Sequence, residues 1–426
     1  MTARTNKQVE EIFLSDCLMN NFNEIDLYLA QSVQYWQYNF FVLSDYPTFN
    51  GNTKLIELLQ SIDDNQLAAY QTTPSLLYPV LKQVIPELLN IEASLFALNK
   101  LSDDCDDNIP FWFKKGIKGK KWTQIDRFSN TIKCSLPILE WCAGKGHLGR
   151  LIHHKTGVKV SAIEWSADLC KQGQQLANQQ GIQQDFIEAN VLSGEADEYL
   201  NQQLHVIALH ACGDLHVRLI NRAKKLLTKK ITISPCCYHL TEHDIYQAVS
   251  KHVRQSSHLL ALSPLSKQDL KLAVAQQSSL KERQSQLNDQ EVWWRLSFDC
   301  LQKSLLKTDK YLNVPSFPKT LLSASFKEFA QWVVTYKQLD INLSHYSDNA
   351  LTIYLVQGRE RLNRLRRVEL VTQFFRRPLE LWLAYDRALS LQEAGYQVQI
   401  STFCDAHVTP RNLLIQASLK YSNTAQ

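Results

Sequence analysis

The segment of residues 137–166 constrains the fold more than any other stretch of the sequence. A short apolar run follows a proline and predicts a buried strand, and the motif Gly144-x-Gly146-x-x-Gly149 comes directly after it. Apolar residues at helical spacing then predict a helix, and an alternating run predicts a second strand that ends at Glu164. This succession of strand, glycine loop, helix, strand and acid predicts a nucleotide-binding βαβ unit.

The chemistry of this unit predicts a ligand that contains a ribose. Glu164 can accept hydrogen bonds from two ribose hydroxyls, which a dinucleotide and S-adenosylmethionine both carry. A glycine loop that only turns a tight corner is the structural alternative. Glu140 favours S-adenosylmethionine, because its carboxylate would repel a pyrophosphate at the helix N-terminus but suits a sulfonium and an ammonium group. The residues expected to bind this cofactor are Glu140, Cys142, Ala143, Gly144, Gly146, Glu164, Trp165, Asn190, Val191 and His210.

Composition narrows the class of protein. The chain has 426 residues, enough for two to three domains, and its hydrophobic content of 45% and charged content of 21% are typical of soluble globular proteins. No apolar run approaches the ~18 residues that span a bilayer, and residues 1–20 lack the apolar core of a signal peptide. The ten cysteines include no C-x-x-C pair, which favours reduced thiols in a cytoplasmic protein without a membrane partner.

Four consecutive regions are expected along the chain. Residues 1–110 predict an N-terminal helical domain, and residues 111–241 carry five strands that alternate with helices, the pattern of a parallel sheet covered on both faces. Residues 242–377 predict a mostly helical insertion. Residues 378–426 predict a last helix and two closing strands, whose short connection requires an antiparallel pair. The expected fold class is therefore α/β, with a Rossmann-like class I methyltransferase sheet divided between residues 111–241 and 378–426.

Three stretches of the predicted sheet resemble a methyltransferase family that has a Cys-Cys signature after the fifth strand. That family includes the methyltransferase-like proteins, the glutathione-S-transferase-C-terminal-domain-containing protein and, more distantly, a tRNA 2′-O-methyltransferase. The resemblance covers about residues 114–240, and it implies the class I fold and S-adenosylmethionine binding without naming a substrate. The stretches are Leu139-Glu-Trp-Cys-Ala-Gly-Lys-Gly-His-Leu-Gly149, Ala208-Leu-His-Ala-Cys-Gly213 and Pro235-Cys-Cys-Tyr238, with Asp386-Arg387 and Pro410-Arg411-Asn412 similar to the C-terminal segment of the family.

Two positions depart from the usual class I pattern. Many class I methyltransferases have glycine where Cys142 stands, although the resembling family tolerates cysteine there. Asn190 stands where an acid commonly holds the adenine amino group. An amide oxygen can accept the same hydrogen bond more weakly, because it is uncharged.

Polar residues follow the fourth and fifth strands, where open parallel sheets bind their ligands. His210 or His239 could serve as a base, or could shape a loop through hydrogen bonds. Asp214 could cap the helix that follows it. The candidate catalytic residues are His210, Asp214, Cys237, Tyr238 and His239.

The adjacent pair Cys236-Cys237 leaves three interpretations open. A cysteine here could attack C6 of a pyrimidine and allow methylation at C5, a mechanism that needs an activated thiolate. Alternatively, both thiols pack in the core, as buried cysteines usually do. Adjacent cysteines are strained as tetrahedral zinc ligands and no second pair occurs at normal spacing, so the sequence predicts no metal.

Charge distribution suggests the acceptor of the methyl group. Residues 114–133 hold seven Lys and Arg against one Asp, residues 218–230 hold six with no acid, and residues 359–377 hold seven against two Glu. Such runs are often solvated helix faces, but three of them around one site favour RNA. The function expected is an S-adenosylmethionine-dependent methyltransferase acting on tRNA or rRNA. The alternatives are a protein or small-molecule methyltransferase and a non-catalytic S-adenosylmethionine-binding interaction protein.

Overall fold

The computed structural model describes residues 2–89, 98–101, 109–133, 136–275 and 282–420. The chain forms two compact units. The sheet unit combines Met1–Val33, Leu89–Ala275 and Phe375–Gln426, and the helical unit combines Gln34–Leu88 and Gln276–Phe374. Each unit draws on several separate stretches of the chain, so its boundaries cannot be compared one to one with the four consecutive regions expected from the sequence. Those four regions therefore stay a prediction.

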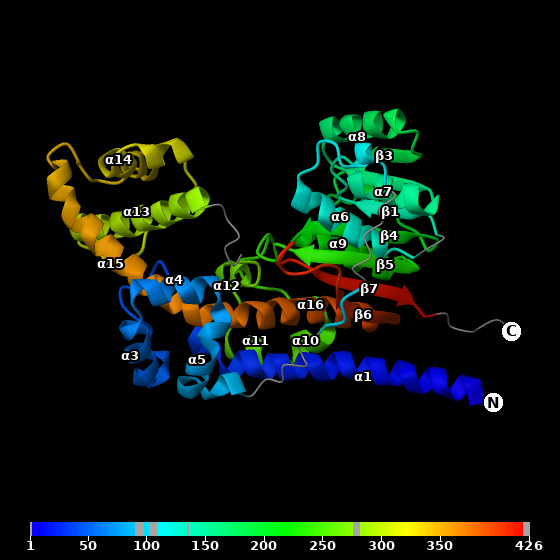
Figure 1. Cartoon of the computed structure of the whole chain (residues 1–426), viewed down its shortest axis with the longest axis horizontal. Coiled ribbons are helices and arrows are strands. Elements are labelled where there is room, and N and C mark those ends of the chain that lie inside the picture. The colour runs from blue at the N-terminus through cyan, green and yellow to red at the C-terminus, as the bar shows by residue number, and fades with distance from the viewer. Residues whose placement is uncertain (1, 90–97, 102–108, 134–135, 276–281, 421–426) are drawn as a thin grey trace. The chain divides into compact units, whose positions relative to one another are not determined.

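A seven-stranded sheet organises the first unit (Figure 1). Its strand order is β3-β2-β1-β4-β5-β7-β6. Neighbouring strands from β3 to β5 are parallel, and β7 pairs antiparallel with both β5 and β6. This arrangement confirms the predicted α/β fold class. The strands are β1 (Ile138–Trp141), β2 (Val160–Glu164), β3 (Gln184–Glu188), β4 (His205–Cys212), β5 (Lys230–Cys236), β6 (Tyr396–Thr402) and β7 (Leu413–Leu419).

The strand order places the candidate site. All four residues of β1 are buried, as expected for a strand covered by helices on both faces. From β1 the chain builds β2 and β3 on one side and β4 and β5 on the other, so the direction of winding switches between β1 and β4. Ligands of open α/β sheets bind outside the carboxyl ends of the strands at such a switch point.

Helices of the sheet unit cover both its faces. Gly157 has φ 71° and closes α7, and the Ser166 hydroxyl accepts a hydrogen bond from the Leu169 N–H at the start of α8. In Figure 1, α8 lies beside β3 and α16 runs along β6. The helices are α1 (Thr2–Gln31), α6 (Gly119–Asn130), α7 (His147–Thr156), α8 (Ala167–Gln179), α9 (Asp214–Lys225), α10 (Lys251–Ser256), α11 (His258–Leu262), α12 (Lys267–Leu272) and α16 (Arg376–Gln392).

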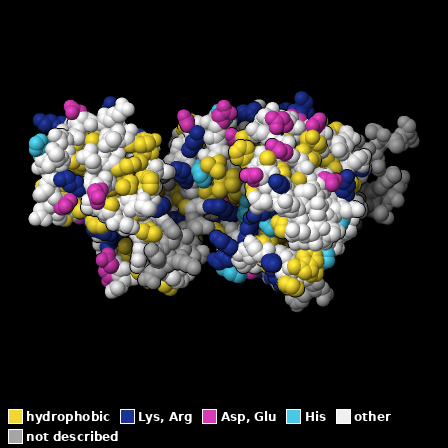
Figure 2. All heavy atoms as spheres, turned by 90° about the horizontal axis from the view of Figure 1, so that it is seen from above, with side chains coloured by type: hydrophobic (Ala, Val, Ile, Leu, Met, Phe, Trp, Pro, Cys, Tyr) yellow, Lys and Arg dark blue, Asp and Glu magenta, His cyan; other side chains and the backbone are white. Residues whose placement is uncertain are grey.

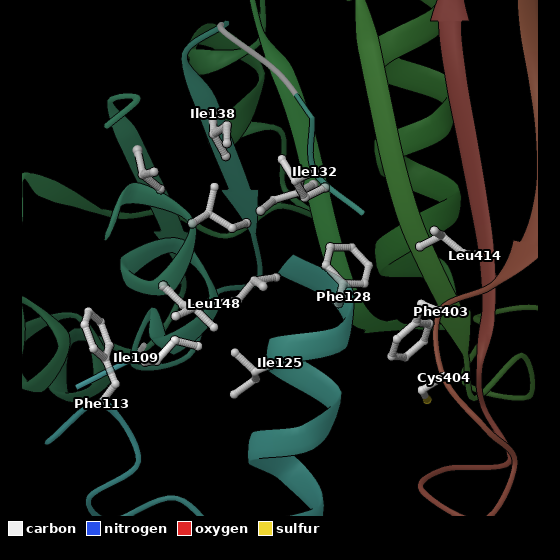
Figure 3. Packing of buried hydrophobic residues seen from close by; sticks show 14 residues of the cluster. Ile109, Phe113, Ile125, Phe128, Ile132, Ile138, Leu148, Phe403, Cys404 and Leu414 are labelled. Atoms are coloured by element: carbon white, nitrogen blue, oxygen red, sulfur yellow. The ribbon is translucent and has the colours of Figure 1, made fainter. Parts of the chain in front are cut away.

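The core beneath the site fixes α6 against the sheet (Figure 3). Ile125 and Phe128 of α6 are buried in one cluster with Leu148 of α7 and Phe403. The rings of Phe128 and Phe403 meet edge to face with centroids 5.7 Å apart. This packing holds the start of α6, with its lysines, close to the carboxyl ends of β1 and β4.

Buried polar contacts join α1 to α16 within the sheet unit. The carboxylate of Asp26 is 1% exposed and accepts hydrogen bonds from Trp382 Nε1 at 2.8 Å and from the Ser257 hydroxyl at 2.5 Å. A buried carboxylate is stable only when such donors surround it. Within the described residues, no helix has both the length and the apolar character that crossing a bilayer requires.

The helical unit is built around α13, α14 and α15. Its core contains Phe298 and Phe329, and a buried ion pair joins Arg361 to Asp299 at 2.6 Å. Gly358 lets α15 approach α13, since a Cβ there would lie 2.7 Å from the Ser297 backbone nitrogen. The remaining helices are α2 (Val33–Trp36), which spans the boundary of the two units, α3 (Thr53–Ser61), α4 (Asp64–Thr72), α5 (Tyr78–Val84), α13 (Glu282–Leu306), α14 (Phe326–Lys337) and α15 (Asp348–Thr372).

Candidate functional site

The glycine loop after β1 leaves room for a ligand against its backbone. Gly144 has φ 59° and donates its N–H to Glu164 Oε2 at 2.9 Å, and the Ala143 N–H donates to the Ile163 carbonyl. A Cβ at Gly144 would meet no atom within 4 Å. Cys142 has φ 57°, which explains why glycine commonly occupies this position: the left-handed conformation is strained for other residues.

Glu164 is the central polar group of the donor side. Its carboxylate is 6% exposed and accepts the N–H groups of Gly144 and, at 3.1 Å, Ser166. A carboxylate offers about four lone-pair positions, so the two remaining positions can accept the two hydroxyls of a ribose. Trp165 follows with 74% of its surface exposed, so its indole ring is available to a ligand. These residues fit the ribose and adenine of S-adenosylmethionine.

Glu140 acts beneath the loop. Its buried Oε2 accepts the Gly149 N–H at 3.0 Å and Gln184 Nε2 at 3.4 Å. Burial raises the pKa of Glu140 to about 7, against the lowering effect of the Gly149 hydrogen bond and of Arg150. One N–H of the first turn of α7 is thus already used by a carboxylate, which disfavours a phosphate there. Gly146 and Gly149 have no room for a Cβ because Gln184 lies against both.

Asn190 and Val191 follow β3. The Asn190 N–H donates to Glu195 Oε2 at 2.8 Å, and Asn190 Oδ1 accepts the Leu192 N–H at 3.0 Å. Val191 is buried beside this turn. The amide oxygen of Asn190 keeps one lone pair for an adenine amino group, so that contact stays a prediction.

His210 lies at a break in β4, where the register shifts between Leu209 and Cys212. It has φ 63°, and its Nε2 lies 2.9 Å from Gln124 Oε1, so Nε2 carries the proton and Nδ1 is the acceptor. Nδ1 is buried without a hydrogen-bond partner among the described residues. Burial, assisted by the charges of Arg411 and Lys121, lowers the pKa of His210 to about 4. The ring is therefore neutral at physiological pH.

Asp214 and Tyr238 hold the backbone around the site. The carboxylate of Asp214 accepts the Glu242 N–H at 2.8 Å. The N-cap of α9 is Gly213, so the expectation that Asp214 caps this helix is wrong. Tyr238 is buried, with the guanidinium carbon of Arg387 4.9 Å from its ring centroid, and burial raises its pKa. Both residues position the segment after β5, and a direct catalytic role for either stays a prediction.

Three sulfur atoms meet at the ends of β4 and β5. The Sγ atoms of Cys212 and Cys236 are 3.3 Å apart, and Cys237 Sγ lies within 4.8 Å of both. The hydrogen bond from Cys236 lowers the pKa of Cys237, assisted by Arg411 and His239, while the pKa of Cys236 is raised. His239 is half-buried, and its Nδ1 has no hydrogen-bond partner in the described part of the chain.

Sequence reasoning missed two residues near His210 as site residues: Gln124, which contacts its ring, and Arg411, which helps to lower its pKa. Arg411 lies about 200 residues away from His210 along the chain, and only the Pro410-Arg411-Asn412 resemblance pointed to its segment. Contacts at such separation leave no periodic or local signal in a single sequence.

Residues 120–244 match a family model described as a methyltransferase domain. The segment that holds β1 to β5 is thus similar to a methyltransferase domain. No curated protein matches the chain. Parts of the chain are also similar to parts of solved methyltransferase structures, and the chain spans less than two thirds of the length of each of the three described next.

Three of these structures indicate the range of similarity. Precorrin-6y C5,15-methyltransferase from Geobacter metallireducens GS-15 is 13% identical over 28% of this chain and 64% of its own, with a TM-score of 0.24. Magnesium protoporphyrin IX methyltransferase from Synechocystis PCC 6803 with bound SAH is 15% identical over 30% and 61%, with a TM-score of 0.24. Geranyl diphosphate methyltransferase in complex with GPP and sinefungin is 14% identical over 26% and 44%, with a TM-score of 0.24.

Proposed function

We propose that the whole chain is an S-adenosylmethionine-dependent methyltransferase whose acceptor is RNA. The observation that carries this proposal is the position of a cluster of lysines beside the donor site. Lys121 at the start of α6 is close enough to His210 and His147 to lower the pKa of both. The distant resemblance of residues 114–240 to a tRNA 2′-O-methyltransferase supports the same acceptor. The lysine segment comprises Lys114, Lys115, Lys118, Lys120 and Lys121, all exposed.

The lysine segment suits a phosphate backbone. Lys114 Nζ lies 5.7 Å from the ring centroid of Trp122, and Lys120 Nζ donates to the His407 carbonyl at 3.4 Å. Figure 2 shows Lys and Arg side chains gathered next to histidines on one face of the sheet unit. Lysines contact phosphates without reading base sequence, so they would position RNA and leave the choice of nucleotide to the strand-end residues.

The arginines of α15 are excluded from this RNA surface because they bind the helical unit itself. Arg361 contacts Asp299, Arg364 donates to the Ser44 carbonyl at 3.0 Å and Arg367 donates to the Ile62 carbonyl at 2.7 Å. Arg359 lies over the Trp293 ring at 3.8 Å. The proposal therefore places phosphate binding at the lysine segment and not at these arginines of α15.

The residues around the donor have separate roles in this proposal. S-adenosylmethionine supplies a methyl group on a sulfonium. The glycine loop and Glu164 hold its ribose, and alignment of the acceptor with the sulfonium provides most of the rate increase. Where the acceptor is a hydroxyl, the neutral His210 can accept its proton at Nδ1.

The test is methyl transfer from labelled S-adenosylmethionine to separated cellular RNA, protein and metabolites. We expect label in RNA. The double variant Lys115→Glu, Lys118→Glu should bind RNA more weakly, with a salt slope reduced by about 0.7–0.9 per lost contact. The matched control Lys171→Glu, Lys251→Glu makes the same charge change at exposed positions on α8 and α10, outside the three basic runs, and should leave the slope unchanged.

Three results would contradict the proposal. Label in protein or metabolites alone would assign a different acceptor. Normal donor binding without transfer to any fraction would indicate a non-catalytic binding protein. Equal loss of RNA affinity in the control variant would show that charge in general, and not the lysine segment, binds RNA.

A further inference from the structure

Three cysteines converge at the carboxyl edge of the sheet, two of them in neighbouring strands and the third directly after the second strand. Cys212 and Cys236 are register partners on β4 and β5, with Sγ atoms 3.3 Å apart. Their ligand atoms and that of Cys237 all lie within 4.8 Å of one another. Two sulfurs on one tetrahedral zinc, each at a Zn–S distance of about 2.3 Å, are about 3.8 Å apart. The observed sulfur–sulfur distances, from 3.3 Å up to at most 4.8 Å, therefore include the distance that one shared ion requires.

The backbone is distorted in a way that produces this convergence. Successive side chains of a regular strand point to opposite faces, so Cys236 and Cys237 would ordinarily not share a ligand. Cys237 has φ 48°, a left-handed conformation that breaks this alternation. The register shift after Leu209 of β4 brings Cys212 opposite Cys236. Adjacent cysteines are poor zinc ligands because the backbone must be strained to turn both thiols towards one ion. In this structure the backbone already has that strained conformation at Cys237.

We propose that Cys212, Cys236 and Cys237 bind a zinc ion, with His239 as the fourth ligand. His239 follows Cys237 by two residues, and its buried Nδ1 has no hydrogen-bond partner among the described residues. Its ring lies outside the group of ligand atoms within 4.8 Å of one another, so it has to turn towards the sulfurs to complete the site. Three thiolates and one imidazole form a known set of ligands for closed zinc sites. The nearby guanidinium of Arg411 offsets the excess negative charge of three thiolates.

Such an ion would have a structural effect on the site, whichever molecule accepts the methyl group. It would join the end of β4 to the segment after β5, which also meets α9 through the hydrogen bond from the Glu242 N–H to Asp214. It would thereby fix the backbone that carries His210 at the break in β4. A nucleophilic thiol at Cys237 would need only one sulfur, so that interpretation does not explain why Cys212 and Cys236 lie beside it.

The test measures zinc on the full-length chain, and it has a spectroscopic readout that needs no variant. Protein purified without chelator should contain one zinc per chain by elemental analysis. Removal with a strong chelator followed by addition of Co²⁺ should produce near-ultraviolet sulfur-to-cobalt absorption and visible bands typical of tetrahedral cobalt. Cys212→Ser, Cys236→Ser and Cys237→Ser should each lose most of the bound zinc, and His239→Gln should release it to a weaker chelator. Cys404→Ser changes a buried cysteine outside the cluster and should retain it.

The outcomes separate this proposal from its competitors. Calorimetry with S-adenosylmethionine shows whether each variant is still folded. A variant that has lost its zinc but still binds S-adenosylmethionine supports the proposed zinc site. Wild-type protein that binds donor but contains no zinc and gives no cobalt–sulfur absorption overturns the proposal. A covalent adduct between Cys237 and RNA containing 5-fluoropyrimidine also overturns it and assigns that thiol as a nucleophile.

Discussion

Glu164→Gln should weaken the binding of S-adenosylmethionine while keeping the size of the side chain. The carboxylate accepts the Gly144 N–H at 2.9 Å and the Ser166 N–H at 3.1 Å, and it has two lone-pair positions left for the ribose. Glutamine offers one oxygen and one NH₂ group in their place. The NH₂ group faces a backbone N–H on one side, so it can neither keep that hydrogen bond nor accept a ribose hydroxyl.

The magnitude follows from the hydrogen bonds that are lost. A hydrogen bond to a charged group contributes about 1.5–3 kcal/mol, so losing one ribose contact should raise Kd about 10- to 150-fold. Release of the Gly144 N–H adds to this value, because the loop is then less well positioned before the ligand binds. Glu164→Asp keeps the charge but shortens the side chain, and should lose less affinity than the glutamine variant.

Isothermal titration calorimetry with S-adenosylmethionine and its 2′-deoxyribose analogue separates the ribose contact from a loop effect. The analogue should bind the parent protein less tightly, while the penalty for the missing hydroxyl should shrink in Glu164→Gln, as a double-mutant cycle requires. Asp185→Asn is the control, since Asp185 is an exposed carboxylate on β3 that pairs with Lys159. Unchanged affinity in Glu164→Gln would refute the assignment of this residue. Tighter binding of a nicotinamide dinucleotide than of S-adenosylmethionine would refute the donor itself.

Two further predictions concern stability. Burial, with the Arg387 charge, lowers the pKa of His216 to about 3. The stability that the neutral ring contributes to the fold is therefore present above pH 6.5 and is lost as the pH falls towards 3. At pH 5 the loss is about 2 kcal/mol of the free energy of unfolding. In urea unfolding between pH 7 and pH 5, this free energy should fall less steeply for His216→Gln than for the parent protein. His407→Gln changes an exposed histidine and should fall as steeply as the parent. Gly358→Ala should destabilise by about 1–3 kcal/mol, because the new Cβ would lie 2.7 Å from the Ser297 nitrogen. Gly119→Ala has open space and should stabilise by about 0.4–1 kcal/mol, so equal denaturation midpoints for the two glycine variants would contradict the packing argument.

The local signals around the donor site were sufficient to predict its architecture. Gly157 ends α7 with φ 71°, and Glu164 ends β2 and accepts the Gly144 N–H, so the sequence of strand, loop, helix and acid is confirmed. These features depend on residues close together in the chain. The role of Glu140 was less accurately predicted: its carboxylate meets the helix N-terminus, as expected, but from beneath the loop and not at its mouth.

Charge runs were less informative because their partners are distant in sequence. Arg361 is 7% exposed and donates to Asp299 and to the Phe41 and Leu43 carbonyls, the last two more than 300 positions away. A helical projection shows that arginines surround α15, but it cannot show which of them meets a carbonyl of another segment. The same limit applies to Asp26 of α1, whose partner Trp382 lies 356 positions further along the chain.

Backbone strain identifies the candidate site independently of any motif. Of eight described non-glycine residues with positive φ, three lie at or near the carboxyl ends of β1, β4 and β5: Cys142, His210 and Cys237. Each such conformation costs about 1–2 kcal/mol that glycine would avoid. A side chain held at that cost is expected where its atoms are used. Cys142 lies in the donor loop, His210 presents an unpaired Nδ1 and Cys237 completes the sulfur cluster. Since the three elements meet only in the folded sheet, the strain is stored where donor, acceptor and the proposed metal would come together.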